Sequence, residues 1–230
     1  MPDANLLILE EAATKLRTLL NEVVFVGGAT LGLLITDTGA APVRATIDVD
    51  VIIEIVSYAE YLEFSEHLKG FGFTEDAREG APLCRWLHEG LVLDVMPLDK
   101  NVLGFTNRWY RDAHQTAQLV QLPSGVSIRA ITAPYFLGTK VEAFLNRGQE
   151  DFYASRDLED CIAVVDGRAS ILTEVDTAPA KLQTYLAEAM RTLLSESRFV
   201  YALPGYLLPD EGSQQRLSSL LRKLRAISQG

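Results

Sequence analysis

Two apolar segments of the chain carry aspartates, which buried strands rarely do. Thr46-Ile47-Asp48-Val49-Asp50 holds two of them, and Leu91-Val92-Leu93-Asp94-Val95-Met96 holds the third. Side chains alternate between the faces of a strand, so Asp48 and Asp50 point the same way. Burial of an unpaired carboxylate such as Asp94 costs free energy. The pattern therefore predicts strands that bring acidic groups together on one face of a sheet.

Three carboxylates on neighbouring strands would supply the hard oxygen ligands that Mg²⁺ prefers, usually alongside substrate phosphates. We expect Asp48 and Asp50 to bind Mg²⁺, and Asp94 to bind a second metal ion or to act as a general base. The alternative for the Asp-x-Asp pair alone is a solvated strand end. Asp94 within its apolar run favours the catalytic interpretation of all three.

Composition limits the classes of function. The chain has 230 residues and a formal net charge of −10, which argues against general nucleic-acid coating but leaves room for a small basic pocket. Its two cysteines, Cys84 and Cys161, have no metal-like spacing, so we expect a reduced, cytoplasmic setting. No signal-peptide pattern opens the sequence, and no apolar run reaches the roughly 20 residues needed to span a bilayer, so no membrane partner is expected.

Periodicity predicts an α/β (α+β) fold with a mixed sheet, flanking helices and a C-terminal helical region. The catalytic α/β domain is expected at 1–130 and a helical domain that completes the cleft at 131–230. Strands are expected at 23–26 and 46–56, and hairpins at 85–96 and 120–129. Helices are expected at 3–21, 29–35, 58–70, 133–146, 157–165, 178–197 and 213–227.

The glycine pair Gly27-Gly28 stands between a predicted strand and a predicted helix. Glycines at such a junction let backbone amides approach phosphate oxygens, with help from the helix N-terminus. An ordinary strand–helix turn is the alternative, and it would be preferred without the aspartates.

These pieces together resemble the nucleotidyltransferase superfamily, specifically its AbiEii-like, toxin-type group. The resemblance is carried by Gly27-Gly28-Ala29-Thr30, by Arg44 to Asp50, by Asp94, by Lys140 to Arg147 and by Arg156 to Asp160. It covers residues 23 to about 168. The chain has Gly28-Ala29 where many members have Gly-Ser, and residues 36–43 look inserted.

The resemblance implies a Mg²⁺-dependent enzyme that transfers an NMP from a nucleoside triphosphate to a hydroxyl acceptor, a tRNA 3′ end or a protein. It also implies a toxin with a cognate antitoxin protein as partner. Nucleotide-binding residues would be Gly27, Gly28, Thr30, Lys140 and Asp157. For Lys140 and Asp157 the alternative is a structural salt-bridge network with their neighbours.

Two rival functions stay open at this point. One is a small-molecule nucleotidyltransferase of the antibiotic-modifying kind. The other is a catalytically inactive binding protein that retains the fold, because a shared scaffold does not fix function.

Overall fold

The computed structural model describes residues 3–147 and 151–230. The chain forms two compact units. The first comprises residues 1–32 and 44–132, and the second comprises residues 33–43 and 133–230. The chain therefore leaves the first unit for a short segment, returns to it, and leaves it again after Thr132.

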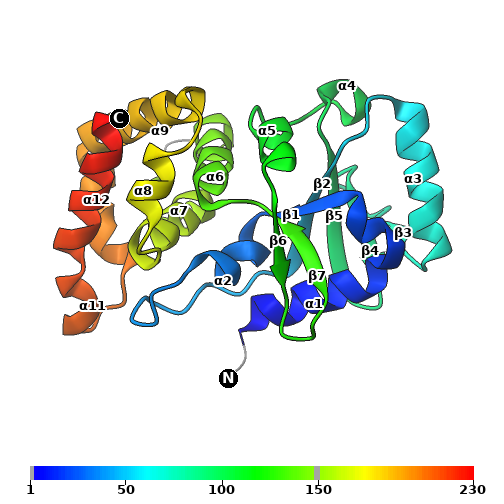
Figure 1. Cartoon of the computed structure of the whole chain (residues 1–230), viewed down its shortest axis with the longest axis horizontal. Coiled ribbons are helices and arrows are strands. Elements are labelled where there is room, and N and C mark those ends of the chain that lie inside the picture. Colours follow the sequence, from blue (N-terminus) through cyan, green and yellow to red (C-terminus); the bar gives the residue numbers. More distant parts are fainter. Residues whose placement is uncertain (1–2, 148–150) are drawn as a thin grey trace. The chain divides into compact units, whose positions relative to one another are not determined.

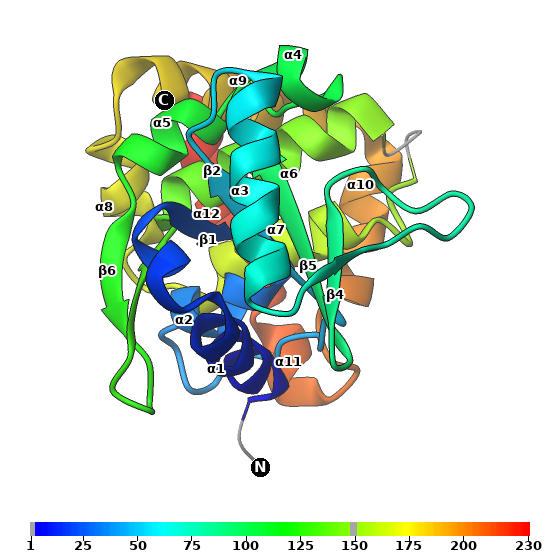
Figure 2. The same cartoon turned by 90° about the vertical axis from the view of Figure 1, so that its right-hand side faces the viewer.

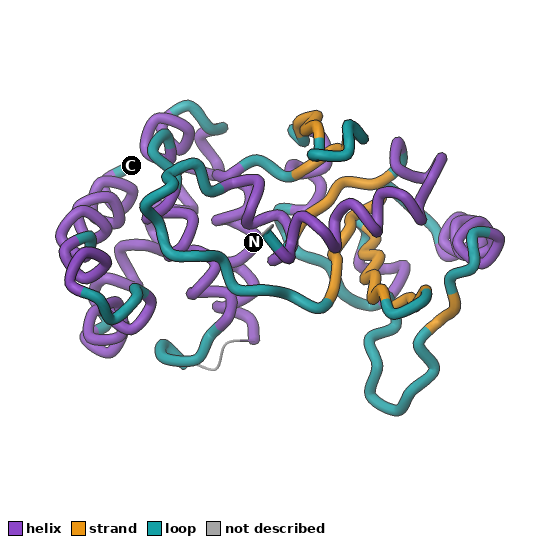
Figure 3. Tube along the Cα trace, turned by 90° about the horizontal axis from the view of Figure 1, so that it is seen from below, coloured by secondary structure: helices purple, strands orange, loops and turns teal. Residues whose placement is uncertain are grey.

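The first unit is built on a seven-stranded mixed sheet in the order β3-β4-β5-β2-β1-β7-β6 (Figure 1). Its strands are orange in Figure 3. Parallel pairing joins β2 to β5 and β1 to β7, and the other neighbours are antiparallel. The expected mixed sheet and both hairpins are confirmed. The strands are β1 (Val23–Val26), β2 (Asp48–Ile53), β3 (Thr74–Glu75), β4 (Arg85–His88), β5 (Leu91–Pro97), β6 (Gln118–Gln121) and β7 (Ser127–Ala130).

The two longest helices of the first unit each begin at a side-chain cap. Asp3 accepts a hydrogen bond from the Asn5 amide at the start of α1 (Ala4–Leu16), and Ser57 does the same at α3 (Tyr58–Gly70). The expected helix over 3–21 is α-helical only to Leu16 and continues as the 3₁₀ helix η1 (Arg17–Asn21). Helix α1 contacts β2 and β5, and Figure 2 shows α1 and α3 on the near side of the strands. Two shorter helices complete the unit, α4 (Lys100–Leu103) and α5 (Tyr110–Gln115).

The connection from β1 to β2 differs from the expectation. The expected helix over 29–35 is two short pieces, η2 (Gly28–Thr30) and α2 (Leu31–Leu34). Strand β2 begins at Asp48 rather than at Thr46, because the Thr46 amide donates to the Asn5 side chain instead of to a neighbouring strand. The aspartates therefore lie at the start of β2.

The second unit is helical. Its helices are α6 (Ala133–Arg147), α7 (Arg156–Gly167), α8 (Ile171–Asp176), α9 (Ala180–Ser195), α10 (Ser197–Ala202), η3 (Leu203–Tyr206), α11 (Glu211–Gln215) and α12 (Leu217–Gln229). Helix α6 packs on α7, α8 and α9, and α12 packs on α7, α8 and α9 (Figure 1). The expected helices at 133–146, 157–165 and 178–197 are present as α6, α7 and α9, and the helix expected at 213–227 is divided at Arg216 into α11 and α12. Helices α8 and α10 are additional. In residues 3–147 and 151–230, no helix is both long and apolar enough to cross a membrane.

Residues 33–43 attach to the C-terminal end of α7. The amides of Thr36 and Asp37 donate to the Gly167 carbonyl oxygen at 3.0 and 2.9 Å. Arg216 donates to the Asp37 carboxylate at 2.8 Å and to the Asp166 carboxylate at 2.8 Å. The segment that looked inserted in the sequence is thus a bound part of the second unit.

Candidate functional site

The three predicted aspartates share one face of the sheet. In the parallel pair of β2 and β5, Asp50 stands opposite Asp94. Asp48 lies two residues before Asp50 and so on the same face. On the other side of β5, Arg85 of β4 stands opposite Asp94. The three aspartates, here called the acidic face, therefore lie on adjacent strands, and Arg85 lies beside them on the next strand.

Arg85 binds two of the three carboxylates. Its Nε and Nη2 atoms donate to the two oxygens of Asp94 at 2.8 and 2.7 Å, and Nη2 also donates to Asp48 Oδ2 at 3.2 Å. The hydrogen bonds and charge of Asp94 raise the pKa of Arg85, so the guanidinium stays charged. Asp94 is buried, with 7% of its surface exposed, and the ion pair compensates that burial.

The chemistry of the acidic face fits a divalent cation, since all three acids offer hard carboxylate oxygens on adjacent, in-register strands. One Arg85 nitrogen contacts Asp48 and Asp94 together, so a positive charge at its position touches both acids. With the side chains as they stand, however, no group of three or more His, Cys, Asp or Glu side chains in the described part of the chain is arranged to hold a metal ion. The cation that Asp48 and Asp94 bind here is the Arg85 guanidinium.

The glycine pair meets the acidic face at Asp50. Gly27 follows Val26, which stands opposite Asp50 in the pairing of β1 with β2. Its φ angle is +68°, and a Cβ atom at this residue would lie 1.9 Å from Asp50 Oδ2. Only glycine allows both this conformation and this close approach. The predicted phosphate-binding turn and one predicted metal ligand are therefore in direct contact.

Thr30 has a structural contact of its own. Its hydroxyl donates to the Gly27 carbonyl oxygen at 2.8 Å, and the residue is fully buried. A direct contact with a nucleotide stays a prediction, whereas support of the Gly27 turn is a function that this hydrogen bond performs already.

Asn5 joins the two halves of the predicted site, a role not expected from the sequence. Its side chain is fully buried and donates to the carbonyl oxygens of Arg44 at 3.0 Å and Gly28 at 3.5 Å. Its oxygen accepts from the Thr46 amide at 2.9 Å, and the Thr46 hydroxyl donates to Asp48 Oδ1 at 2.7 Å. Asn5 thus connects the glycine turn to the residues that orient Asp48. A polar residue in the apolar pattern of a predicted helix was the only signal for it in the sequence.

Lys140 and Asp157 lie in the second unit, where they pair with each other. Lys140 Nζ lies 2.6 Å from Asp160 Oδ2 and 3.4 Å from Asp157 Oδ1. Arg147 also donates to both oxygens of Asp157, at 3.3 Å each. Asp160 is fully buried. These contacts form the salt-bridge network that was the alternative interpretation, and the role of Lys140 and Asp157 in nucleotide binding stays a prediction.

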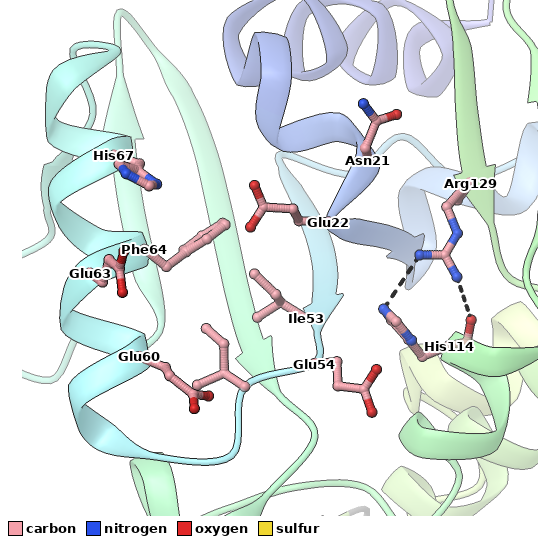
Figure 4. A pocket seen from close by; sticks show the side chains of 11 residues that line it. Asn21, Glu22, Ile53, Glu54, Glu60, Glu63, Phe64, His67, His114 and Arg129 are labelled. Carbon is pink, nitrogen blue, oxygen red and sulfur yellow. Dashed lines mark hydrogen bonds between the residues drawn. The ribbon is translucent and has the colours of Figure 1, made fainter.

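A separate pocket of about 460 Å³ opens at the other end of β2, where Ile53 ends the strand (Figure 4). Glu60 and Glu63 of α3 line one side of it, Arg129 and His114 line the other, and Glu22 and Glu54 lie between them. Arg129 donates to the His114 carbonyl oxygen at 2.8 Å. Burial lowers the pKa of His114, and the charge of Arg129 lowers it further. None of the residues predicted for catalysis or nucleotide binding lines this pocket.

The sequence matches no protein-family model, and no curated protein matches it. Two solved structures are similar in fold. An antigenic nucleotidyltransferase-like protein from Paracoccidioides brasiliensis has a TM-score of 0.51 and 18% sequence identity, over 92% of this chain and 97% of that one. A candidate nucleotidyltransferase from H. pylori has a TM-score of 0.50 and 13% identity, over 100% of this chain and 95% of that one. The fold is therefore that of nucleotidyltransferase-like proteins, as the sequence predicted.

Proposed function

We propose that the protein is a nucleotidyltransferase that moves an NMP from a nucleoside triphosphate to a hydroxyl acceptor. One observation carries the proposal: Asp48, Asp50 and Asp94 share one face of adjacent strands, and Asp50 touches the Gly27 turn. The likeness of the fold to nucleotidyltransferase-like proteins supports it.

In the proposed reaction, the acceptor oxygen attacks the α-phosphorus of the triphosphate. The bond from that phosphorus to the bridging oxygen of the β-phosphate breaks, and pyrophosphate leaves. Mg²⁺ bound by Asp48 and Asp50, with Asp94 as a ligand or base, would supply charge neutralisation at the phosphates. In the role of base, Asp94 would accept the proton of the attacking hydroxyl, and the backbone amides of Gly27 and Gly28 would approach the phosphate oxygens.

The acceptor that we propose is a tRNA 3′ end, with the protein acting in the cytoplasm as a toxin restrained by an antitoxin protein. This part of the proposal rests on the resemblance of the motifs alone. The fold and the acidic face are equally consistent with a small-molecule acceptor, so the assay below includes both classes.

One observation favours the rival function of an inactive binding protein. Arg85 neutralises Asp94 and contacts Asp48, so both of these acids already have a cationic partner. An inactive protein would retain this pairing and transfer nothing. An active one must bind its metal ion and nucleotide in spite of it.

The test is an assay of label transfer from each NTP, with Mg²⁺, to total tRNA and to a panel of aminoglycoside and lincosamide compounds. We expect transfer to tRNA, and a loss of at least about 100-fold in both Asp48→Asn and Asp50→Asn, because charge stabilisation dominates this chemistry. Glu79→Gln is the matched control, since Glu79 is an exposed acid of the same unit. Transfer only to the small molecules would support the antibiotic-type enzyme. Absence of both label transfer and nucleotide binding would support the inactive protein.

A further inference from the structure

Arg85 lies where the acidic face would receive a cation. The hairpin of β4 and β5 places it opposite Asp94, and its guanidinium binds both oxygens of that carboxylate. The same Nη2 atom reaches Asp48 on the strand beyond. A planar guanidinium matches a carboxylate in this two-bonded geometry, which makes the pair strong and directional.

Burial makes this pairing more than a surface contact. The exposed fractions of the side chains are 21% for Arg85, 10% for Asp94 and 30% for Asp48. A buried acid beside two other acids requires a compensating positive charge, and ion pairs with little exposure are only weakly screened by salt. Arg85 is the side chain of the described residues that supplies this charge to both Asp48 and Asp94.

We propose that Arg85 is an intramolecular competitor of the divalent cation, and that a metal ion binds the acidic face only when the guanidinium leaves Asp94. This inference rests on the proposed function, because it assumes that the acids bind a metal ion. The apparent association constant for the ion is then the intrinsic constant multiplied by the fraction of molecules in which Arg85 has left Asp94. Removal of Arg85 increases the affinity even though it removes no metal ligand.

Competition by Arg85 also explains why the carboxylates of Asp48 and Asp94 lie close together when no metal ion is bound. An oxygen of Asp48 and one of Asp94 bind a single nitrogen of Arg85, so the guanidinium holds the two strands' carboxylates toward one point. When Arg85 leaves, both oxygens become available to one cation. The arginine therefore keeps the ligands near one another and blocks them at the same time.

The experiment measures Mn²⁺ binding, without nucleotide, from the electron paramagnetic resonance signal of the free ion. The proteins are the full-length wild type, Arg85→Gln and Arg78→Gln. Arg78 is the matched control because it lies in the same unit and pairs with Asp76, outside the acidic face. We expect Arg85→Gln to bind Mn²⁺ at least about tenfold more tightly than wild type, and Arg78→Gln to stay within about twofold, since it tests the loss of one positive charge alone.

Equal affinity in wild type and Arg85→Gln, or weaker affinity in the variant, would overturn the competition and leave the proposed function standing. Absence of Mn²⁺ binding in both proteins would overturn the competition together with the metal-dependent function. Circular dichroism checks that Arg85→Gln is folded. If it is not, Arg85→Lys replaces it: a lysine keeps the charge but cannot bind both oxygens of Asp94, so we still expect tighter Mn²⁺ binding than in wild type, and unchanged affinity would contradict the proposal.

Discussion

Two features require glycine at position 27: its backbone conformation and the close approach of the Asp50 side chain. The Gly27 φ of +68° and ψ of −168° lie in a region essentially restricted to glycine, and a Cβ would lie 1.9 Å from Asp50 Oδ2. We expect Gly27→Ala to lower the free energy of unfolding by about 2–4 kcal/mol, as the sum of backbone strain and overpacking. Urea denaturation followed by circular dichroism measures the change.

Gly125→Ala is the comparison for a positive φ angle without the close contact. Gly125 has a φ of +88° in the turn between β6 and β7, and a Cβ there would meet nothing within 4 Å. This variant carries the backbone strain alone, about 1–2 kcal/mol. If both variants lose the same stability, the close approach of Gly27 to Asp50 contributes nothing and the packing argument fails.

At the scale of single residues, the sequence predicted which face the aspartates share and that Asp94 is buried, but it did not predict which residues bind them. The alternation of Asp48 and Asp50 in a β-branched segment fixed their common face, and the apolar run fixed the burial of Asp94. Asn5 could not be predicted as a partner, because its three side-chain hydrogen bonds join segments that are adjacent only after folding.

At the scale of elements, the hairpin of β4 and β5 shows how much register a short turn determines. Glu89 and Gly90 form the turn between paired residues His88 and Leu91, so counting back along both strands places Arg85 opposite Asp94. This contact was therefore within reach of the sequence. The start of β2 at Asp48 was not, because it depends on the hydrogen bond of Thr46 to Asn5 in a distant helix.

The segment 33–43 is held as an element by Arg216 and the end of α7. Arg216 pairs with Asp37 and Asp166, and the Thr36 and Asp37 amides donate to the Gly167 carbonyl oxygen. We expect Arg216→Gln to increase hydrogen exchange of the peptide covering 33–43 by at least about tenfold, since local opening no longer breaks these ion pairs. Exchange measured by mass spectrometry on the full chain tests this.

Arg222→Gln is the control for Arg216, because Arg222 is an exposed arginine on the following helix. Its exchange pattern in 33–43 should equal that of wild type. Unchanged exchange in Arg216→Gln would mean that the backbone hydrogen bonds to Gly167 alone hold the segment.

At the scale of the whole molecule, the sequence showed a change of character near residue 130 but not the excursion at 33–43. Apolar periodicity reports which residues face a core, and it does not say which core. Residues Ile35 and Ala40 pack against Gly167 of the second unit, a contact between positions far apart in the chain. Assignment of this segment to its unit therefore required coordinates.

Net charge is the property of the whole molecule that most limits its partners. The chain carries a formal charge of −10, whereas the proposed substrates, a triphosphate and a tRNA, are polyanions. General binding to phosphate backbones needs many Lys or Arg contacts, which this composition disfavours. We expect no complex with random duplex DNA below a protein concentration of about 100 μM at about 150 mM salt, measured by fluorescence anisotropy.

The same argument predicts how the affinity for the proposed acceptor, tRNA, depends on salt concentration. Each phosphate neutralised by the protein adds about −0.7 to −0.9 to the slope of log K against log salt. If tRNA is bound through a local pocket, we expect a slope of about −3 or shallower, together with no binding of the duplex. A steep slope, or micromolar binding of random DNA at the same salt, would show an extended basic surface at odds with the net charge. Such a result would place recognition in backbone contacts rather than in a confined site around the acceptor end.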